Sequence, residues 1–252
     1  MGTHRSPPPP EGVLSSFVKW ILARGSGRGQ SQGKGVDTVK IKIRQAKPED
    51  AKLLAWCMLM AGRSHLKVGI WDFVISQPEE RCLQFLQMLA LEGPRHMCYY
   101  TEFLVAEVDG HPAAALEGFD PLKNGEDTVT IPMVNVIQKM GLTEQDMAPG
   151  VEKLGAFMTC HSDFLQGAWV VEQVATRPEY RRVGAISKLL EAVLDQGRQE
   201  GFKQAQVSFY IGNTPGERAY RKAGFKYLDE KRHPDFERVI GSPGMIRLVR
   251  DL

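Results

Sequence analysis

The chain has 252 residues, of which 42% are apolar and 25% charged, with a formal net charge of +2 at pH 7. This length allows one sizeable domain or two small ones, and the composition is that of a soluble globular protein with a real core. The charge is uneven: residues 1–36 hold five Lys/Arg against one acidic residue (+4), so the remainder sums to −2. We therefore do not expect the folded part to bind nucleic acid through a basic surface.

Cysteine spacing argues against a metal site. The chain contains no C-x-x-C and no H-E-x-x-H, and its cysteines are widely separated: Cys57, Cys82, Cys98 and Cys160. We expect no metal and no disulfide, and reduced thiols fit a cytoplasmic compartment. No apolar run approaches the roughly 18 residues that a membrane-spanning helix needs.

The first 36 residues predict a flexible basic tail. Four prolines at 7–10 favour an extended segment, and the glycine-rich stretch 24–35 is typical of a linker. Between them, residues 14–22 place apolar side chains at helical spacing. Such a segment fits a membrane surface or an organelle-targeting signal, a helix docked on its own domain, or disorder. These alternatives stay open.

The folded domain is predicted over residues 37–252. Alternating apolar residues at 39–46 indicate a strand, and Pro48 followed by two acidic residues opens a helix. A second helix follows Pro78. Residues 103–119 predict a hairpin, because two apolar runs flank Asp109-Gly110, a pair that tolerates the positive φ of a tight turn.

Residues 120–166 predict a helical insertion. They contain two or three short helices, one of which begins with a capping box made by Thr143 and Asp146. A connection this long is often a lid or a binding element. Decoration of the surface is the alternative.

The C-terminal part alternates strands and helices. We expect a strand at 170–175, a helix at 184–200 and a further strand at 203–211. The next helix would begin with Thr214 as its cap, Pro215 at the first position and Glu217 reaching back, before two final strands. This order predicts an α/β (α+β) fold with a mixed sheet and helices on its faces.

The turn between the strand and the helix at 184–200 suits an anion. The first amides of a helix lack intrahelical partners, and the helix dipole places positive charge there. Arg181 and Arg182 strengthen this field, and Gly184 leaves room for a ligand near the backbone. A phosphate-bearing ligand and two merely solvated arginines are both compatible with this stretch alone.

Two signatures in the chain resemble those of the GNAT acyl-CoA N-acyltransferase superfamily. VATRPEYRRVGA and the residues after it resemble the coenzyme A signature, with Arg181, Gly184 and Ile186 at its defined positions. NTPGERAYRKAGF is similar to the second signature, with Asn213 and Tyr220 matching. Together with the opening strand and helix and the central hairpin, the resemblance covers most of residues 39–250. It implies a mostly antiparallel central sheet flanked by helices.

The chain departs from the family pattern at two places. Ile186 stands where the family prefers glycine or alanine, and its branched side chain is expected to narrow the turn. The stretch 120–166 is longer than the usual link between the third and fourth strands.

The resemblance implies acetyl transfer from acetyl-CoA to a primary amine by direct attack on the thioester. An ammonium must lose a proton before it attacks, and Glu172 is the candidate base, with Glu117 as an alternative. The Val174 N–H would stabilise the oxyanion, and Tyr220 would protonate the departing thiolate. Glu172 as an arginine-paired carboxylate and Tyr220 as a groove-filling ring are the structural alternatives.

The residues expected to bind the cofactor come from the fourth strand, the turn and the second signature. They are Val174, Ala175, Thr176, Arg181, Arg182, Val183, Gly184, Ala185, Ile186, Ser187, Asn213 and Tyr220. The amides from 181 to 187 would wrap the pyrophosphate. Asn213 would contact the cofactor from just before its helix.

The acceptor, a small-molecule or protein amine, is not specified by the sequence. His161, Asp163, Asp120 and Glu117 are candidates for lining its site. Cys160 beside His161 is not expected to be a nucleophile, because adjacent residues rarely meet in catalytic geometry. A non-catalytic CoA-binding regulatory module and an interaction protein acting through the basic tail remain as alternative functions.

Overall fold

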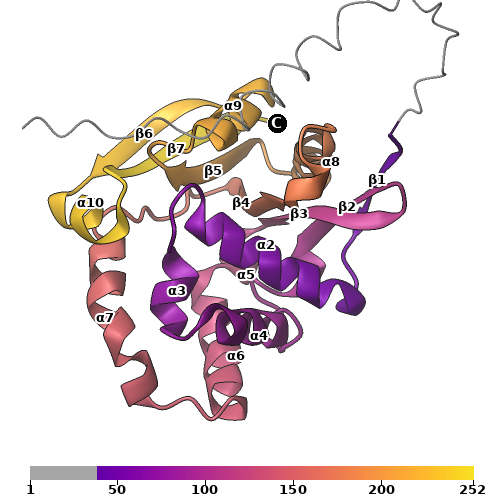
Figure 1. Ribbon diagram of the computed structural model, residues 1–252. Coiled ribbons are helices and arrows are strands. Elements are labelled where there is room, and N and C mark those ends of the chain that lie inside the picture. Colours follow the sequence, from indigo (N-terminus) through magenta and orange to yellow (C-terminus); the bar gives the residue numbers. More distant parts are fainter. Residues whose placement is uncertain (1–38) are drawn as a thin grey trace, which may run out of the picture. The chain divides into compact units, whose positions relative to one another are not determined.

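The computed structural model describes residues 39–252, so the tail predicted at 1–36 lies outside the described residues. One seven-stranded sheet runs through this part of the chain in the order β1-β2-β3-β4-β5-β7-β6 (Figure 1). Its strands are β1 (Ile41–Gln45), β2 (Phe103–Val108), β3 (His111–Phe119), β4 (Ala168–Thr176), β5 (Gln204–Tyr210), β6 (Lys226–Arg232) and β7 (Gly244–Asp251). Only β4 and β5 pair in parallel, which confirms the predicted mixed, mostly antiparallel sheet.

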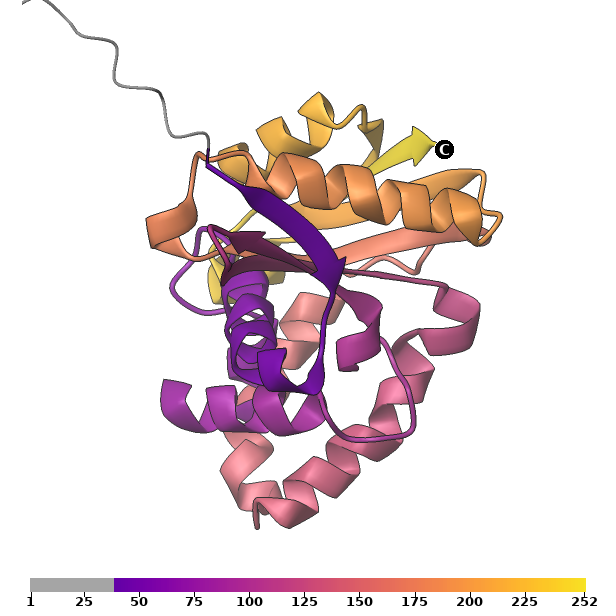
Figure 2. The ribbon, with the colours of Figure 1, turned by 90° about the vertical axis from the view of Figure 1, so that its right-hand side faces the viewer.

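Helices cover both faces of the sheet (Figure 2). Helix α8 packs on β1 to β4 from one side, with α9 beside it, and α2 packs on β3 and β4 from the other side, backed by α4. The helices are α2 (Ala51–Arg63), α3 (Ile70–Ile75), α4 (Glu79–Leu89), α5 (Pro121–Asn124), α6 (Glu126–Lys139), α7 (Glu144–Met158), α8 (Ala185–Gln199), α9 (Thr214–Lys222) and α10 (Pro234–Ile240). None of these described helices has the length and apolar character to cross a bilayer.

The β2–β3 hairpin turns as its sequence predicts. Asp109 and Gly110 adopt φ angles of 51° and 86°, which are the left-handed values that a two-residue turn of this kind requires. Val108 therefore pairs directly with His111. A one-residue shift of the register between Ala106 and Glu107 then brings Phe103 opposite Glu117. The turn and this shift together fix which residues of β3 face α2 and which face α8.

Strand β4 changes partner along its length. Its parallel pairing with β5 ends at Val171 opposite Val207, while its antiparallel pairing with β3 continues to Thr176. Gln173 has a φ of 54°, and the β3–β4 register shifts by one residue there. Such a bulge bends a strand, and here it leaves the β5-facing edge of residues 172–176 unpaired by β5.

The core lies in two layers with an aromatic cluster at one end. Between the sheet and α8, the helical stripe that includes Leu189 and Val193 is fully buried. The layer on the α2 side contains the buried side chains of α2 and α4. At the end near α7 and α10, Phe157, Tyr210 and Phe236 pack with ring centroids 5.9 to 6.4 Å apart. This cluster fixes α7 against β5.

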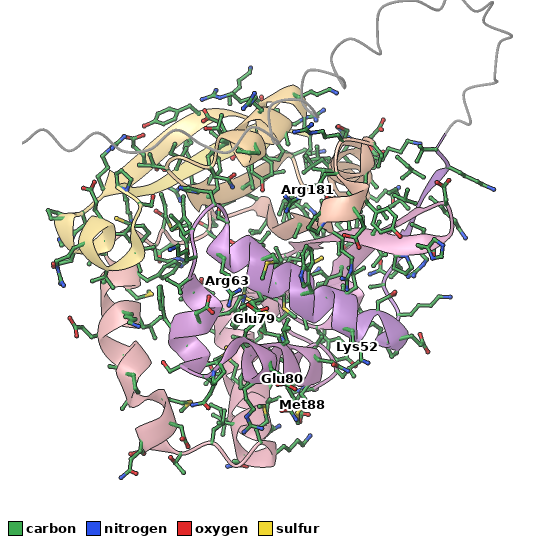
Figure 3. All side chains as sticks on the ribbon, in the orientation of Figure 1. Lys52, Arg63, Glu79, Glu80, Met88 and Arg181 are labelled. Atoms are coloured by element: carbon green, nitrogen blue, oxygen red, sulfur yellow. The ribbon has the colours of Figure 1, made fainter. Side chains whose placement is uncertain are left out.

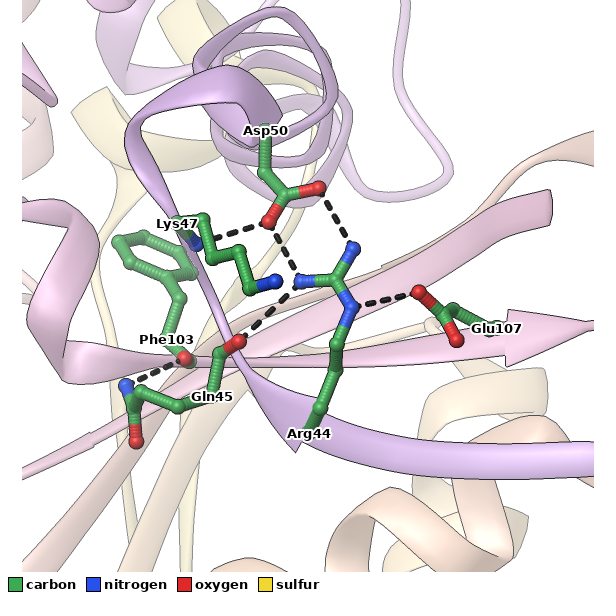
Figure 4. Close-up of polar contacts among 6 residues, drawn as sticks. All are labelled: Arg44, Gln45, Lys47, Asp50, Phe103 and Glu107. Carbon is green, nitrogen blue, oxygen red and sulfur yellow. Dashed lines mark hydrogen bonds and ion pairs between the residues drawn. The ribbon is translucent and has the colours of Figure 1, made fainter. Parts of the chain in front are cut away.

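An ion-pair network joins β1 to the start of α2 (Figure 4). Arg44 donates to both oxygens of buried Asp50, at 2.6 and 2.9 Å, and its Nε donates to Glu107 of β2 at 2.6 Å. Asp50 also accepts from the Lys47 amide at 2.8 Å. Burial alone would raise the pKa of Asp50, but the Arg44 and Lys47 bonds lower it below its usual value.

A second arginine holds three helices together. Arg63 at the end of α2 donates two bonds to Asp72 of α3, at 2.7 and 2.9 Å, and one to Glu79 of α4 at 2.5 Å. Figure 3 labels Arg63 and Glu79. Because α3 has only six residues, this fixed arginine does much to set its position. Two residues of helix α3, Trp71 and Val74, line the cavity described below.

The described helices match the sequence predictions in part. The short helices α3 and α10 were not predicted. Residues 121–158 form three helices, which agrees with the predicted two or three, and the last has the expected Thr143–Asp146 capping box. Helix α9 is capped by Asn213, whose side chain accepts from the Gly216 amide at 3.1 Å, so the prediction of Thr214 as cap was wrong. Pro215 is therefore the second residue of the helix and not the first. Glu217, predicted to reach back to the cap, instead pairs with Arg221 at 2.8 Å.

Candidate functional site

A cavity of about 1040 Å³ lies where β4 and β5 separate. Its lining comes from α2, α3, α6, the end of α7, the beginnings of α8 and α9, and strands β4, β5 and β7. The separation of two parallel strands exposes main-chain edges and side chains of both sheet faces at one place. The cavity therefore joins groups that are far apart in the sequence.

Of the twelve residues predicted to bind the cofactor, all but one line this cavity. Residues 174–176, 181, 182, 184–187, 213 and 220 do so. The exception is Val183, whose side chain packs into the core layer on the α8 side. Only its amide remains available for a ligand.

The turn before α8 presents a row of free amides. Within residues 39–252, the N–H groups of residues 182–187 donate no hydrogen bond, whereas that of Lys188 bonds the Gly184 carbonyl. The Arg181 amide already donates to the Pro178 carbonyl at 3.3 Å, so the predicted row of amides begins one residue later than expected. Left-handed residues in a turn of this kind make concavities that bind anions, and here Arg182 and Gly184 have φ angles of 67° and 93°.

Side chains reinforce the positive character of this end. Arg181 lies beside the beginning of α8 (Figure 3), and Arg181 and Arg182 are both exposed. A Cβ on Gly184 would meet nothing within 4 Å, so the protein itself requires glycine there only for its φ angle. The side chain of Ile186 lines the cavity and also packs on the core layer on the α8 side. Its amide N–H donates no hydrogen bond within the described residues.

Glu172 lies immediately before the bulge of β4. It is half-buried, lines the cavity and pairs across the strands with Glu117 of β3. Burial raises the pKa of Glu172 to about 7, with nearby His161 lowering it and Glu126 raising it. A carboxyl group with this pKa exchanges protons readily near neutral pH. Within the described residues Glu172 forms no ion pair with an arginine. The alternative interpretation of Glu172 as an arginine-paired carboxylate therefore does not agree with the structure.

Tyr220 lies on α9 and is 6% exposed. Its ring packs against Phe209 and Phe225, with centroids 5.5 and 6.2 Å away, and the residue lines the cavity. Burial, followed by the charge of Glu172, raises the pKa of the Tyr220 phenol. The phenol therefore stays protonated at neutral pH and can donate a proton into the cavity.

Sequence reasoning missed an ion pair at the other end of the cavity. His161, after α7, lies 2.8 Å from Glu126 at the start of α6, measured from Nε2 to Oε1, and both line the cavity. The bond to Glu126 raises the pKa of His161, although burial acts against it. His161 was a candidate for the acceptor site, but its partner lies 35 residues away and no spacing rule connects them.

The helical segment 120–166 forms a wall of the cavity. It contributes Glu126, Val129, Met133, Phe157, Met158, Cys160, His161 and Ser162. Of the two interpretations of this segment, a binding element agrees with these positions better than decoration of the surface.

The other acceptor candidates do not reach the cavity. Asp120 caps α5 and pairs with Lys123, and Asp163 contributes its carbonyl to Arg247. Glu117 is fully buried behind Glu172, and burial together with the Glu172 charge raises its pKa well above its usual range. Cys160 lines the cavity, but burial raises the pKa of its thiol, which disfavours the thiolate.

Comparisons with known proteins agree with this geometry. The model of the acetyltransferase (GNAT) family matches residues 145–225, a range that includes β4, α8, β5 and α9. A search of curated protein sequences finds no significant match. Solved structures with a similar fold include an acetyltransferase with a TM-score of 0.61 and 20% identity, covering 83% of this chain and 98% of that one.

Two further structures share the fold. An N-acetyltransferase from Staphylococcus aureus Mu50 has a TM-score of 0.56 and 18% identity, covering 83% of this chain and 100% of its own. An agmatine N-acetyltransferase in its apo form has a TM-score of 0.50 and 16% identity, with 84% and 100% covered. Residues 145–225 thus match the acetyltransferase (GNAT) family model, as the two signatures predict, and the described residues share their fold with solved acetyltransferases.

Proposed function

We propose that this protein is an acetyl-CoA-dependent N-acetyltransferase that transfers an acetyl group to a primary amine. The observation that carries the proposal is a single cavity with opposite chemistry at its two ends. Free amides and two arginines lie at one end, and Glu172 and Glu126 lie at the other. An anionic acyl donor and a cationic acceptor fit these two ends respectively.

Acetyl-CoA would bind along the end formed by β4, α8 and α9. The amides of residues 182–187 would hold its diphosphate, helped by Arg181 and Arg182. The unpaired edge of residues 174–176 would hydrogen-bond the amides of the pantetheine arm, as an added strand does. Asn213 uses its carbonyl oxygen to cap α9, so only its amide NH₂ is free to contact the cofactor.

The chemistry then needs three proton transfers. Glu172, with a pKa of about 7, takes a proton from the acceptor ammonium. The amine nitrogen attacks the thioester carbon, and the Val174 N–H stabilises the resulting oxyanion. The C–S bond breaks as the acetamide forms, and the departing thiolate takes the Tyr220 proton. The second proton of the attacking nitrogen passes, directly or through water, to the Tyr220 phenolate and restores the phenol. No covalent enzyme intermediate is required.

Two measurements on the purified full-length chain test the proposal. Calorimetry should detect binding of acetyl-CoA, and thiol release in the presence of a panel of amines should exceed release without amine. Binding without amine-dependent release would favour the non-catalytic CoA-binding module. If acetyl-CoA does not bind at millimolar concentration, the proposed function is wrong and the interaction protein acting through its tail is favoured.

A further inference from the structure

The acceptor end of the cavity has an apolar wall. Most of its residues come from helices, and all except the exposed Met158 pack on the core clusters opposite to α8. Most are aromatic or thioether side chains. The wall residues are Trp56, Met60, Ile70, Trp71, Val74, Met97, Val129, Met133, Phe157, Met158 and Met245. Such a wall is stabilised by contact with an apolar body of a ligand. For a second ammonium it provides the weak attraction of aromatic rings and no carboxylate.

Charged groups are few at this end. Among the described residues only two carboxylates line the cavity, Glu126 and Glu172, and Glu126 is already paired with His161. Arg247, also in the lining, is paired with Asp229 of β6. Glu172 is thus the one carboxylate of the lining, among residues 39–252, that has no charged partner.

This balance limits the acceptor to one cationic nitrogen. A first ammonium can lie against Glu172, where the transfer takes place. A second ammonium would have no free carboxylate to pair with among the described lining residues. Aromatic faces and hydroxyl groups only partly replace such a partner, so the second charge is disfavoured. A polyamine or an amino sugar therefore fits this wall poorly, and an apolar chain or ring fits it well.

We propose that the acceptor is a monoamine whose nitrogen is attached to an apolar aliphatic or aromatic body. This inference rests on the proposed function and narrows it to one substrate class. The apolar wall selects the body of the substrate, and Glu172 selects the single amine.

Matched amines test the inference on the full-length chain. kcat/KM should rise roughly fourfold for each methylene from propylamine to hexylamine, because each added CH₂ is buried against the wall. Hexylamine should exceed 1,6-diaminohexane, which has the same length and a second ammonium, by at least about tenfold. Phenethylamine should also be a substrate. A flat series, or a diamine that equals or exceeds hexylamine, would overturn the inference.

A designed carboxylate supplies the second test. Val129 is half-buried in α6 and lines the cavity, so Val129→Glu places a carboxylate where the diamine lacks a partner. The variant should shift the ratio of the two kcat/KM values toward the diamine by about tenfold. Thr130→Glu, on the exposed side of the same helix, should leave the ratio unchanged.

The outcomes separate the inference from the function beneath it. If Val129→Glu remains active and its ratio equals that of Thr130→Glu, the wall does not select the substrate and the inference is wrong. If acetyl-CoA binds by calorimetry but only polyamines are acetylated, or no amine of the series is, the inference also fails. If acetyl-CoA itself does not bind, the proposed function fails and the inference falls with it.

Discussion

Replacing Glu172 with glutamine should stabilise the protein while it removes activity. Burial raises the pKa of Glu172 from 4.5 to about 7 in the folded state. At about 1.4 kcal/mol for each pH unit, this difference amounts to about 3.4 kcal/mol of folding free energy lost once the group is ionised. Glutamine keeps the shape of the side chain without the charge, so it avoids this loss.

The sign of the effect depends on pH. Between about pH 4.5 and pH 7 the folded state binds more protons at Glu172 than the unfolded state does, so stability falls as pH rises through this window. The loss is small at low pH and complete above pH 7. Integration from pH 5 to pH 8 gives about 2.5 kcal/mol, and water in the cavity reduces this to about 2 kcal/mol.

Urea denaturation at pH 5 and pH 8 measures this difference. The stability advantage of Glu172→Gln over the wild type should be about 2 kcal/mol larger at pH 8 than at pH 5, and Glu191→Gln on the exposed face of α8 should show no such change. kcat/KM of the wild type should rise about tenfold from pH 6 to pH 8, and the variant should lose roughly 100-fold or more. An equal advantage at both pH values would refute the buried-carboxylate argument, and retained activity would refute the base role.

Three further changes probe the site and its frame. Tyr220→Phe should slow turnover by roughly 100-fold and leave acetyl-CoA binding by calorimetry nearly unchanged; unchanged turnover would remove the proton-donor role. Gly184→Ala should cost about 1–2 kcal/mol in thermal denaturation, because its φ of 93° is strained for alanine, and an unaltered Tm would contradict this reasoning. Asp50→Asn should cost about 2–3 kcal/mol at pH 7, because it weakens the partner of Arg44. Since the pKa of Asp50 is lowered, this advantage should begin to fall below about pH 4 and be lost as pH falls through the lowered pKa, and an advantage undiminished between pH 5 and pH 3 would argue against the ion pair.

The elements with strong local signals were predictable. The Asp109-Gly110 turn, the capping box at Thr143 and the apolar stripe of α8 each depend on residues close in sequence, and each appears in the structure. Helix α10 had a comparable signal, a proline followed by acidic residues at 234–237, but the flanking strands obscured it. Helix α3 is too short for helical periodicity to distinguish it from a buried strand.

Features of the site that depend on tertiary structure were not predictable. The pairing of Glu172 with Glu117 requires the strand register and its shift at Gln173, and neither follows from residue types. The contact between His161 and Glu126 requires the path of α6 and α7 around the cavity. The roles at 181–187 came from the family resemblance, whereas the apolar acceptor wall came only from the packing of helices on the α2 side.

The position of Glu172 links the two halves of the proposed mechanism. Pairing with β5 ends at Val171, and the bulge begins at Gln173, so Glu172 is the residue at which β4 leaves its parallel partner. Beyond it, the backbone edge is free for the acyl donor. The side chains of Glu172 and Glu117 both face the α2 side of the sheet, where the apolar wall of the cavity lies. One local distortion of a strand thus brings the proposed thioester-binding edge next to the proposed base, and the energetic cost of the half-buried carboxylate follows from this placement.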